Sequence, residues 1–456
     1  MTRLVFHLAG AVDFSEVRYV VISLEEPSVF NSMTRPFQCT GREEPFVVLR
    51  QDVIPTDATK AAGVKLFTEV TRHPELAQYL PAALQTQPPQ RYPVFVELAT
   101  EAGVEALPWE ALCSPSGEFL GLDERWAVGR IVDSQAIDRP LWDFKPPLRV
   151  AAVMSCLGVP AYDEWRALKN AVMSGPEVEV ELLTVVSEPL LYTELSNLAR
   201  DQRQSAQFPH LSVRMVPQEL SELQEMVSRF GPHLLHFFCH GSTEGSPHIQ
   251  LAVKSDWVSQ SPANSLNIET REFKDFVGRT SDPPWLTVLN CCESAALGRS
   301  DNLHSLALGL VYQVGLPAVI GMREPIASTD ASLFTGAFYK RLLTDFKARI
   351  LRLPGSDEPI DWARFLVAAR NSLAKKHKTM TLTQAASSTK EWTLPVVYMQ
   401  RTPITFQIAP SQTRRARLEI EALQGFLAQL PPSTPLSLRE DAESQLRLLV
   451  SQLEEQ

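Results

Sequence analysis

The stretch Pro232-His-Leu-Leu-His-Phe-Phe-Cys-His-Gly241, read together with Trp285-Leu-Thr-Val-Leu-Asn-Cys-Cys-Glu-Ser294, decides the fold of this chain. Each is a short apolar run with the length of a buried strand. The first ends in His240 and Gly241, and the second ends in Cys291 and Cys292. If the two strands are parallel neighbours, they bring a base and a thiol together, as in a hydrolase with a cysteine nucleophile.

Strands and helices alternate on both sides of these two stretches. The segment 301–314 is the clearest helix, because its apolar residues recur at three and four; Gly315 ends it and Pro317 prevents its continuation. Further strands are expected at 148–154, 178–185, 316–321 and 394–399, and further helices at 162–173, 218–230, 330–343 and 362–374. This alternation predicts an α/β fold with a mostly parallel central sheet covered by helices on both faces. Reactive residues of such sheets gather at the carboxyl ends of the strands.

The pattern divides the chain into three parts. Residues 1–145 form a β-rich extension, with strands expected at 4–9, 19–24, 45–50 and 92–99, a strand pair within 119–132, and a helical pattern from 64 to 84. Lys145-Pro-Pro marks the boundary to an α/β core at 146–402. The tail, 403–456, carries two apolar stripes separated by prolines, which predict a helical hairpin. We expect the hairpin to pack on its own domain in preference to the alternative, a coiled-coil seam presented to a partner.

Composition narrows the function classes. The chain has 456 residues, is 44% hydrophobic and has a formal charge of -10 without a long basic block, which argues against nucleic acid as the partner. No apolar run reaches the roughly 18–20 residues that span a bilayer, so we expect a cytoplasmic protein without a membrane partner. The six cysteines show no framework spacing, which favours reduced thiols over disulfides.

The candidate chemistry is that of a thiolate and its base. A thiol becomes a strong nucleophile only as the thiolate, and His suits the task of removing its proton near neutral pH. The backbone N–H groups of Gly241 and of the nucleophilic cysteine could then stabilise an oxyanion. Adjacent strand residues point to opposite faces, so only one of Cys291 and Cys292 can face His240, and spacing does not choose between them.

Other interpretations of the same residues remain open at this point. Both cysteines could be small buried hydrophobes, and His236 could be a core or supporting group. A zinc site is disfavoured, because Cys239 points away from the face shared by His236 and His240 and no CxxC pair occurs. No phosphate-binding glycine motif is present, and we expect no cofactor.

Three motifs follow one another in order: Phe237-Phe-Cys-His240-Gly, Leu286-Thr-Val-Leu-Asn-Cys-Cys292-Glu-Ser-Ala, and Gly315-Leu-Pro-Ala-Val-Ile-Gly-Met322. Together with Leu107-Pro-Trp-Glu110, they resemble the CHAT domain, a branch of the caspase and separase superfamily of cysteine peptidases. The resemblance runs from about residue 90 to residue 398 and implies a caspase-like α/β/α sandwich. It also implies peptide-bond hydrolysis.

The resemblance assigns roles to individual residues. The family's catalytic His precedes Gly, and its nucleophile precedes an acidic residue and Ser or Thr. His240 and Cys292 match these positions, with the N–H groups of Gly241 and Cys292 as the oxyanion hole; Cys291 becomes a packing residue. Asn290 stands where relatives that cut after basic residues often carry Asp, which argues against strict Arg or Lys preference. Asn290 and Glu293 are the candidates for the substrate pocket.

The sequence therefore predicts a cysteine endopeptidase that acts on protein substrates. Family members often belong to bacterial defence or cell-death systems and are activated by a sensor, so an activating protein partner is expected by resemblance. The alternative is a catalytically silent protein of the same fold that acts as a scaffold by association.

Overall fold

The computed structural model describes residues 4–12, 18–25, 34–39, 41–88, 90–98, 104–134, 141–144, 146–174, 178–205, 210–243, 246–277, 282–292, 305–351, 359–376, 380–408, 420, 423–427, 430–431 and 436–454. Within these residues one sheet of fourteen strands runs through the molecule, in the order β3-β2-β1-β4-β5-β15-β14-β13-β10-β7-β8-β9, with the pair β11 and β12 attached to β10.

The strands of this sheet come from both predicted parts of the chain. The extension supplies β1 Leu4–Val12, β2 Arg18–Glu25, β3 Arg35–Phe37, β4 Val94–Leu98 and β5 Val128–Val132. The core supplies β7 Leu148–Ser155, β8 Val180–Val186, β9 Leu211–Met215, β10 Leu234–Ser242, β11 His248–Leu251, β12 Leu266–Glu269, β13 Leu286–Cys291, β14 Ala318–Met322 and β15 Pro395–Gln400.

Two parallel halves of the sheet run in opposite directions. Strands β14, β13, β10, β7, β8 and β9 are parallel to one another. Strand β15 is antiparallel to β14, and from there β5, β4 and β1 run parallel to β15. The expected mixed α/β fold with a largely parallel central sheet is therefore confirmed.

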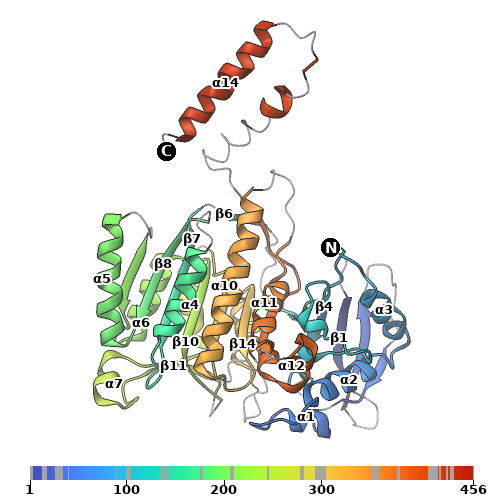
Figure 1. The fold of residues 1–456 in the computed structure, drawn as a ribbon. Helices are drawn as coiled ribbons and strands as arrows, with labels where there is room; N and C mark the ends of the chain where they lie inside the picture. Colours follow the sequence, from blue (N-terminus) through green and yellow to red (C-terminus); the bar gives the residue numbers. More distant parts are fainter. Residues whose placement is uncertain are drawn as a thin grey trace.

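Helices cover both faces of the sheet, and the apolar core forms one cluster on each face (Figure 1). The face with α4 Tyr162–Met173, α10 Ser328–Leu351 and α11 Trp362–Ala374 holds one cluster. The opposite face is covered by α2 Ala58–Val70, α3 Pro74–Leu84, α6 Leu220–Phe230, α8 Thr270–Val277 and α9 Leu306–Gly309. The remaining helices are α1 Glu44–Val48, α5 Pro189–Ser205, α7 Lys254–Ser259, α12 Leu382–Ser388 and α14 Leu436–Glu454.

Several elements of the structure differ from the helices and strands that the sequence predicts. The strand predicted at 45–50 is instead helix α1, Glu44–Val48, followed by a turn, because Pro45 lies in the first helical turn, where a missing N–H has no partner to lose. The expected strand pair within 119–132 is a 3₁₀ turn, Leu120–Leu122, followed by the single strand β5. The segment 248–259, for which the sequence analysis gives no element, contains β11, which ends at Leu251, and α7, which begins at Lys254.

The helix after the second stretch is also shorter than expected. It consists of α9 and a π-helical turn, Leu310–Val314, which ends at Gly315 with φ of 81° as the sequence predicts. Residues 301–304 of the predicted helix lie outside the described residues.

The chain on either side of the predicted core is joined by a small sheet. Strands β6 Leu141–Phe144 and β16 Thr405–Ile408 pair in parallel, separately from the main sheet. Beyond them, α14 lies apart from the sheet and its helices (Figure 1), and Leu438 and Leu448 are about half exposed, at 49% and 57%. This differs from the expected packing of the tail on its own domain. Among the described residues no helix is long and apolar enough to cross a membrane.

Candidate active site

Three neighbouring strands end together at the carboxyl edge of the sheet. Cys239 of β10 is in register with Ser155 of β7 on one side and with Cys291 of β13 on the other. The next residues along these strands are Cys156, His240 and Cys292. The sheet register therefore places His240 between two cysteines, one from each neighbouring strand.

The absence of a side chain at Gly241 allows the ends of β10 and β13 to meet. A β-carbon built on Gly241 would lie 1.9 Å from the carbonyl oxygen of Cys292 and 3.6 Å from its nitrogen. The first distance is far below any van der Waals contact, so no other residue fits here without moving one strand end. Glycine is required for this close approach of two backbones.

The hydrogen bonds of His240 define its tautomer. Its Nε2 lies 2.8 Å from the carbonyl oxygen of Leu157. Because a carbonyl only accepts hydrogen bonds, Nε2 carries the hydrogen and donates it. In the neutral ring, Nδ1 then holds the lone pair and is the nitrogen able to take a proton. The segment after β7 thus orients the ring through a backbone oxygen.

The thiol of Cys156 lies against His240, but its surroundings make it a poor nucleophile. Its Sγ lies 3.5 Å from Nε2, the nitrogen already engaged with Leu157. The side chain is 5% exposed, and burial together with the neighbouring Cys292 and Cys291 raises the pKa of the Cys156 thiol to about 12. Cys292 is partly exposed instead. A reactive thiol needs both access and a stabilised thiolate.

The structure places the other predicted site residues as follows. Cys291 is buried on the opposite face, in the cluster that also contains Cys239 and Leu289, which agrees with a packing residue. Burial and a hydrogen bond with Cys291 raise the pKa of Cys239 well above its usual value. Glu293 lies outside the described residues. The oxyanion-hole assignment of the Gly241 and Cys292 N–H groups remains a prediction.

Asn290 lies in a buried polar group that we call the Glu164 cluster: Glu164, His236, Asn290, Thr335 and Tyr339. Oε1 of Glu164 accepts hydrogen bonds from Nδ2 of Asn290 (2.9 Å) and from Oγ1 of Thr335 (2.5 Å), and it lies 2.9 Å from Nε2 of His236. Asn290 is 1% exposed and Glu164 and His236 are fully buried. Its placement in the substrate pocket therefore remains a prediction, while its amide is hydrogen-bonded inside the protein.

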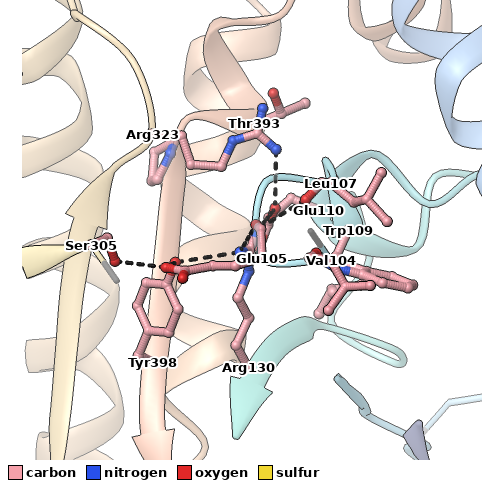
Figure 2. Close-up of polar contacts among 12 residues, drawn as sticks. Val104, Glu105, Leu107, Trp109, Glu110, Arg130, Ser305, Arg323, Thr393 and Tyr398 are labelled. Atoms are coloured by element: carbon pink, nitrogen blue, oxygen red, sulfur yellow. Dashed lines mark hydrogen bonds and ion pairs between the residues drawn. The ribbon is translucent and has the colours of Figure 1, made fainter. Parts of the chain in front are cut away.

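A second buried polar group, which we call the Arg130 cluster, joins the extension to the core (Figure 2). Arg130 of β5 binds the carboxylate of Glu110 with two hydrogen bonds of 3.0 and 2.9 Å. Oε1 of Glu105 accepts hydrogen bonds from Oγ of Ser305 (2.7 Å) and from the hydroxyl of Tyr398 on β15 (2.8 Å). Figure 2 shows Glu105 between Ser305 and Arg130. Ser305 also caps α9 by accepting from the N–H of Leu308.

Sequence reasoning missed three residues that touch or support the site: Cys156, Leu157 and Glu164. Cys156 lies two residues beyond the predicted strand 148–154, and His240 and Cys292 also lie at the ends of predicted strands, so the position of Cys156 could have been found from the strand ends. Leu157 contributes only a backbone oxygen, which no residue type reveals. Glu164 has the sequence pattern of an exposed acid in the first turn of a helix.

The crystal structure of the Arg-specific cysteine proteinase gingipain R superposes with a TM-score of 0.40 and 10% identity, covering 75% of this chain and 69% of that one. A probable protease of Vitiosangium sp. (strain GDMCC 1.1324) is 27% identical over 170 residues, which are 36% of this chain and 20% of that protein. The chain therefore matches about a fifth of that relative's length. The CHAT domain profile matches residues 60–371. This match spans more than half of the sequence, and the chain belongs to the CHAT family.

Proposed function

We propose that this chain is a cysteine endopeptidase in which His240 and Cys292 form the catalytic dyad. The observation that carries the proposal is the meeting of β10 and β13, where Gly241 lies against the backbone of Cys292. The tautomer of His240 supports it, because Nδ1 is left as the basic nitrogen while Nε2 donates to Leu157. The CHAT family match and a relative named as a probable protease agree with this chemistry.

The reaction would proceed through a thioacyl-enzyme. Nδ1 of His240 takes the thiol proton of Cys292, and Sγ attacks the carbonyl carbon of the scissile peptide bond. The negative charge on the carbonyl oxygen is stabilised by the N–H groups of Gly241 and Cys292. His240 returns its proton to the leaving amine as the C–N bond breaks. Water, deprotonated by His240, then attacks the thioester and releases the acid and the free thiol.

Labelling with a cysteine-directed peptide electrophile tests the proposal. Cys292 should be the modified residue, and both Cys292→Ala and His240→Ala should abolish labelling and turnover. Cys113→Ala, a buried cysteine remote from the site, serves as the matched control and should label like the wild type. Modification of Cys291 or Cys156 in place of Cys292 would contradict the assignment. Unchanged labelling in His240→Ala would remove the base from the mechanism.

The substrate class follows from the family, and the residue before the cleaved bond is a separate question. Protein substrates are expected, and Asn290 offers no charge to pair with a basic side chain. A peptide library cut by the active protein gives the preferred residue directly; strict cleavage after Arg or Lys would contradict this expectation. If neither labelling nor cleavage occurs under any activating condition, the scaffold alternative replaces the peptidase.

Regulation by a partner in a bacterial defence or cell-death system is the finer part of the proposal. It is motivated by the N-terminal extension and the helical tail, which flank the core. Activity of the isolated chain, measured over a range of protein concentrations, tests it. Full activity at low concentration without any partner would contradict regulation by association.

A further inference from the structure

Glu164 connects the two strands that end in the proposed dyad. Its carboxylate reaches His236 on β10, four residues before His240, and Asn290 on β13, two residues before Cys292. The same oxygen, Oε1, accepts from Thr335 on α10. One side chain of α4 is therefore hydrogen-bonded to both catalytic strands and to the helix that covers them.

These hydrogen bonds lie on the same face of the sheet as His240 and Cys292. His236, Phe238 and His240 share one side of β10 by strand alternation, and Asn290 is two residues from Cys292 along β13. Nδ2 of Asn290 also donates to the carbonyl oxygen of Ala331 and to Oγ1 of Thr335. Backbone hydrogen bonds fix the register of the strands, whereas these side-chain hydrogen bonds fix the positions of α4 and α10 against the strands.

The Glu164 cluster fills the protein interior with polar atoms, which lower the stability of the fold compared with apolar packing. Oε2 of Glu164, Nδ1 of His236, Oδ1 of Asn290 and the hydroxyl of Tyr339 are buried and have no hydrogen-bond partner among the residues that the structure describes. Unpaired buried polar atoms destabilise a fold, and apolar side chains of similar volume often replace such groups without loss. Stability alone therefore does not account for the buried carboxylate of Glu164. Its partners His236 and Asn290 precede the proposed catalytic residues by four and two positions.

We propose that Glu164 is a positioning residue for the dyad: its carboxylate holds β10 and β13 so that His240 and Cys292 stay aligned. The inference rests on the proposed function for its effect on catalysis, but the alignment itself can be measured without any substrate. A displacement of about 1 Å at a reacting group can lower a rate by about a hundredfold. Loss of the carboxylate should therefore act on the rate of reaction of Cys292 more than on substrate binding.

The test uses Glu164→Gln in the full chain, with the rate of alkylation of Cys292 by iodoacetamide followed by mass spectrometry over a pH series. We expect the rate near neutral pH to fall about tenfold and its pH profile to move toward that of His240→Ala. In peptide cleavage, kcat should fall about ten- to a hundredfold while KM stays within about twofold. A purely structural role would lower the melting temperature and leave the pH profile in place.

A pair exchange provides the sharper arm of the test. Glu164→Gln combined with Asn290→Asp restores one carboxylate and one amide with their positions exchanged, since the Gln amide can donate to the new carboxylate. Alkylation of Cys292 in this double variant should recover most of the rate lost in Glu164→Gln. Failure of the exchange, with both proteins folded, would overturn the proposal. If Glu164→Gln does not fold, Asn290→Ala removes the bond from β13 to Glu164, together with those to Ala331 and Thr335, keeps the bond from His236 to Glu164, and should still slow alkylation.

Glu110→Gln is the matched control, because it neutralises a fully buried carboxylate of the Arg130 cluster. It should lower stability and leave the alkylation profile of Cys292 unchanged; an equal change in both variants would overturn the proposal. The outcomes also separate the two proposals. Rapid His240-dependent alkylation without any peptide cleavage would reject the peptidase and leave the positioning role to be judged by alkylation alone.

Discussion

The Arg130 cluster and the Glu164 cluster are both buried, yet they are built from different charges. In the first, Glu110 faces the guanidinium of Arg130 at hydrogen-bond distance, with Arg323 3.9 Å away. In the second, Glu164 receives its hydrogen bonds from an amide, a hydroxyl and an imidazole. The first group ties the extension to the core, and the second ties two strands of the core to each other.

This difference changes what each carboxyl contributes. Burial alone would raise the pKa of Glu110, but the charge and hydrogen bonds of Arg130 outweigh it and hold the pKa below its usual value. Burial raises the pKa of Glu105 in the same cluster, and hydrogen bonds from Ser305 and Tyr398 offset this only in part. Within the Arg130 cluster, the direct pairing of Glu110 with Arg130 therefore lowers the pKa of that carboxyl, whereas the pKa of Glu105, which is bonded by hydroxyl groups, stays raised.

Removal of Arg130 should have the largest effect. In Arg130→Met, Glu110 stays buried with its two direct hydrogen bonds lost, which should lower the free energy of unfolding by about 3–5 kcal/mol. Urea denaturation measures the loss. Arg323→Met is the control: this guanidinium is farther from Glu110, and the loss should be clearly smaller. Equal losses in the two variants would show that the close ion pair of Arg130 and Glu110 contributes no more to stability than the longer contact of Arg323.

Asn290→Asp should come next, because it converts the Glu164 cluster into two neighbouring carboxyls. Like charges at hydrogen-bond distance raise the pKa of the new carboxyl above its usual value of about 4. The folded state then binds a proton that the unfolded chain releases, so stability falls as pH rises through the usual and then the raised pKa. We expect a deficit of about 1–3 kcal/mol at neutral pH that shrinks toward pH 4. Urea denaturation at several pH values checks this; a deficit independent of pH would contradict it.

The two clusters also show how far sequence reasoning reaches. The α/β fold and the strand ends at His240 and Cys292 could be predicted, because continuous apolar runs and their termini depend on local sequence. The partners of buried polar groups could not, because they come from distant segments. Glu164 and Thr335 are 171 positions apart, and Glu105 and Tyr398 are 293 apart. Periodicity carries no information about such pairs.

Asn290 illustrates the same limit within one strand. Its role in the substrate pocket stays a prediction, but the hydrogen bond of its amide to Glu164 could not be predicted from its place two residues before Cys292. Strand alternation gives the face of a side chain but not what packs on that face. Helix α1 stands where the sequence predicts a strand for a related reason: a five-residue segment has too few periods to separate the two patterns.

The smallest effect is expected for Glu105→Gln. Because burial raises the pKa of Glu105, its carboxyl favours folding at low pH, and this contribution is lost as pH rises from the usual value of about 4.3 through the raised one. Glutamine does not titrate, and its oxygen can still accept from Ser305 and Tyr398. The variant should therefore match the wild type near pH 4 and exceed it by up to about 1 kcal/mol at neutral pH.

Glu110→Gln should show the opposite trend in the same denaturation series. The lowered pKa of Glu110 means that its carboxylate adds stability above the usual value, and this contribution is lost as pH falls through the lowered pKa. Its variant should therefore be weakest at neutral pH and approach the wild type in acid. The contributions of Glu105 and Glu110 to stability would then change with pH in opposite directions. The reason is that Arg130 pairs with the side chain of Glu110 but donates to the backbone oxygen of Glu105. Parallel curves for the two variants would show that burial, and not the partner, decides what a carboxyl contributes here.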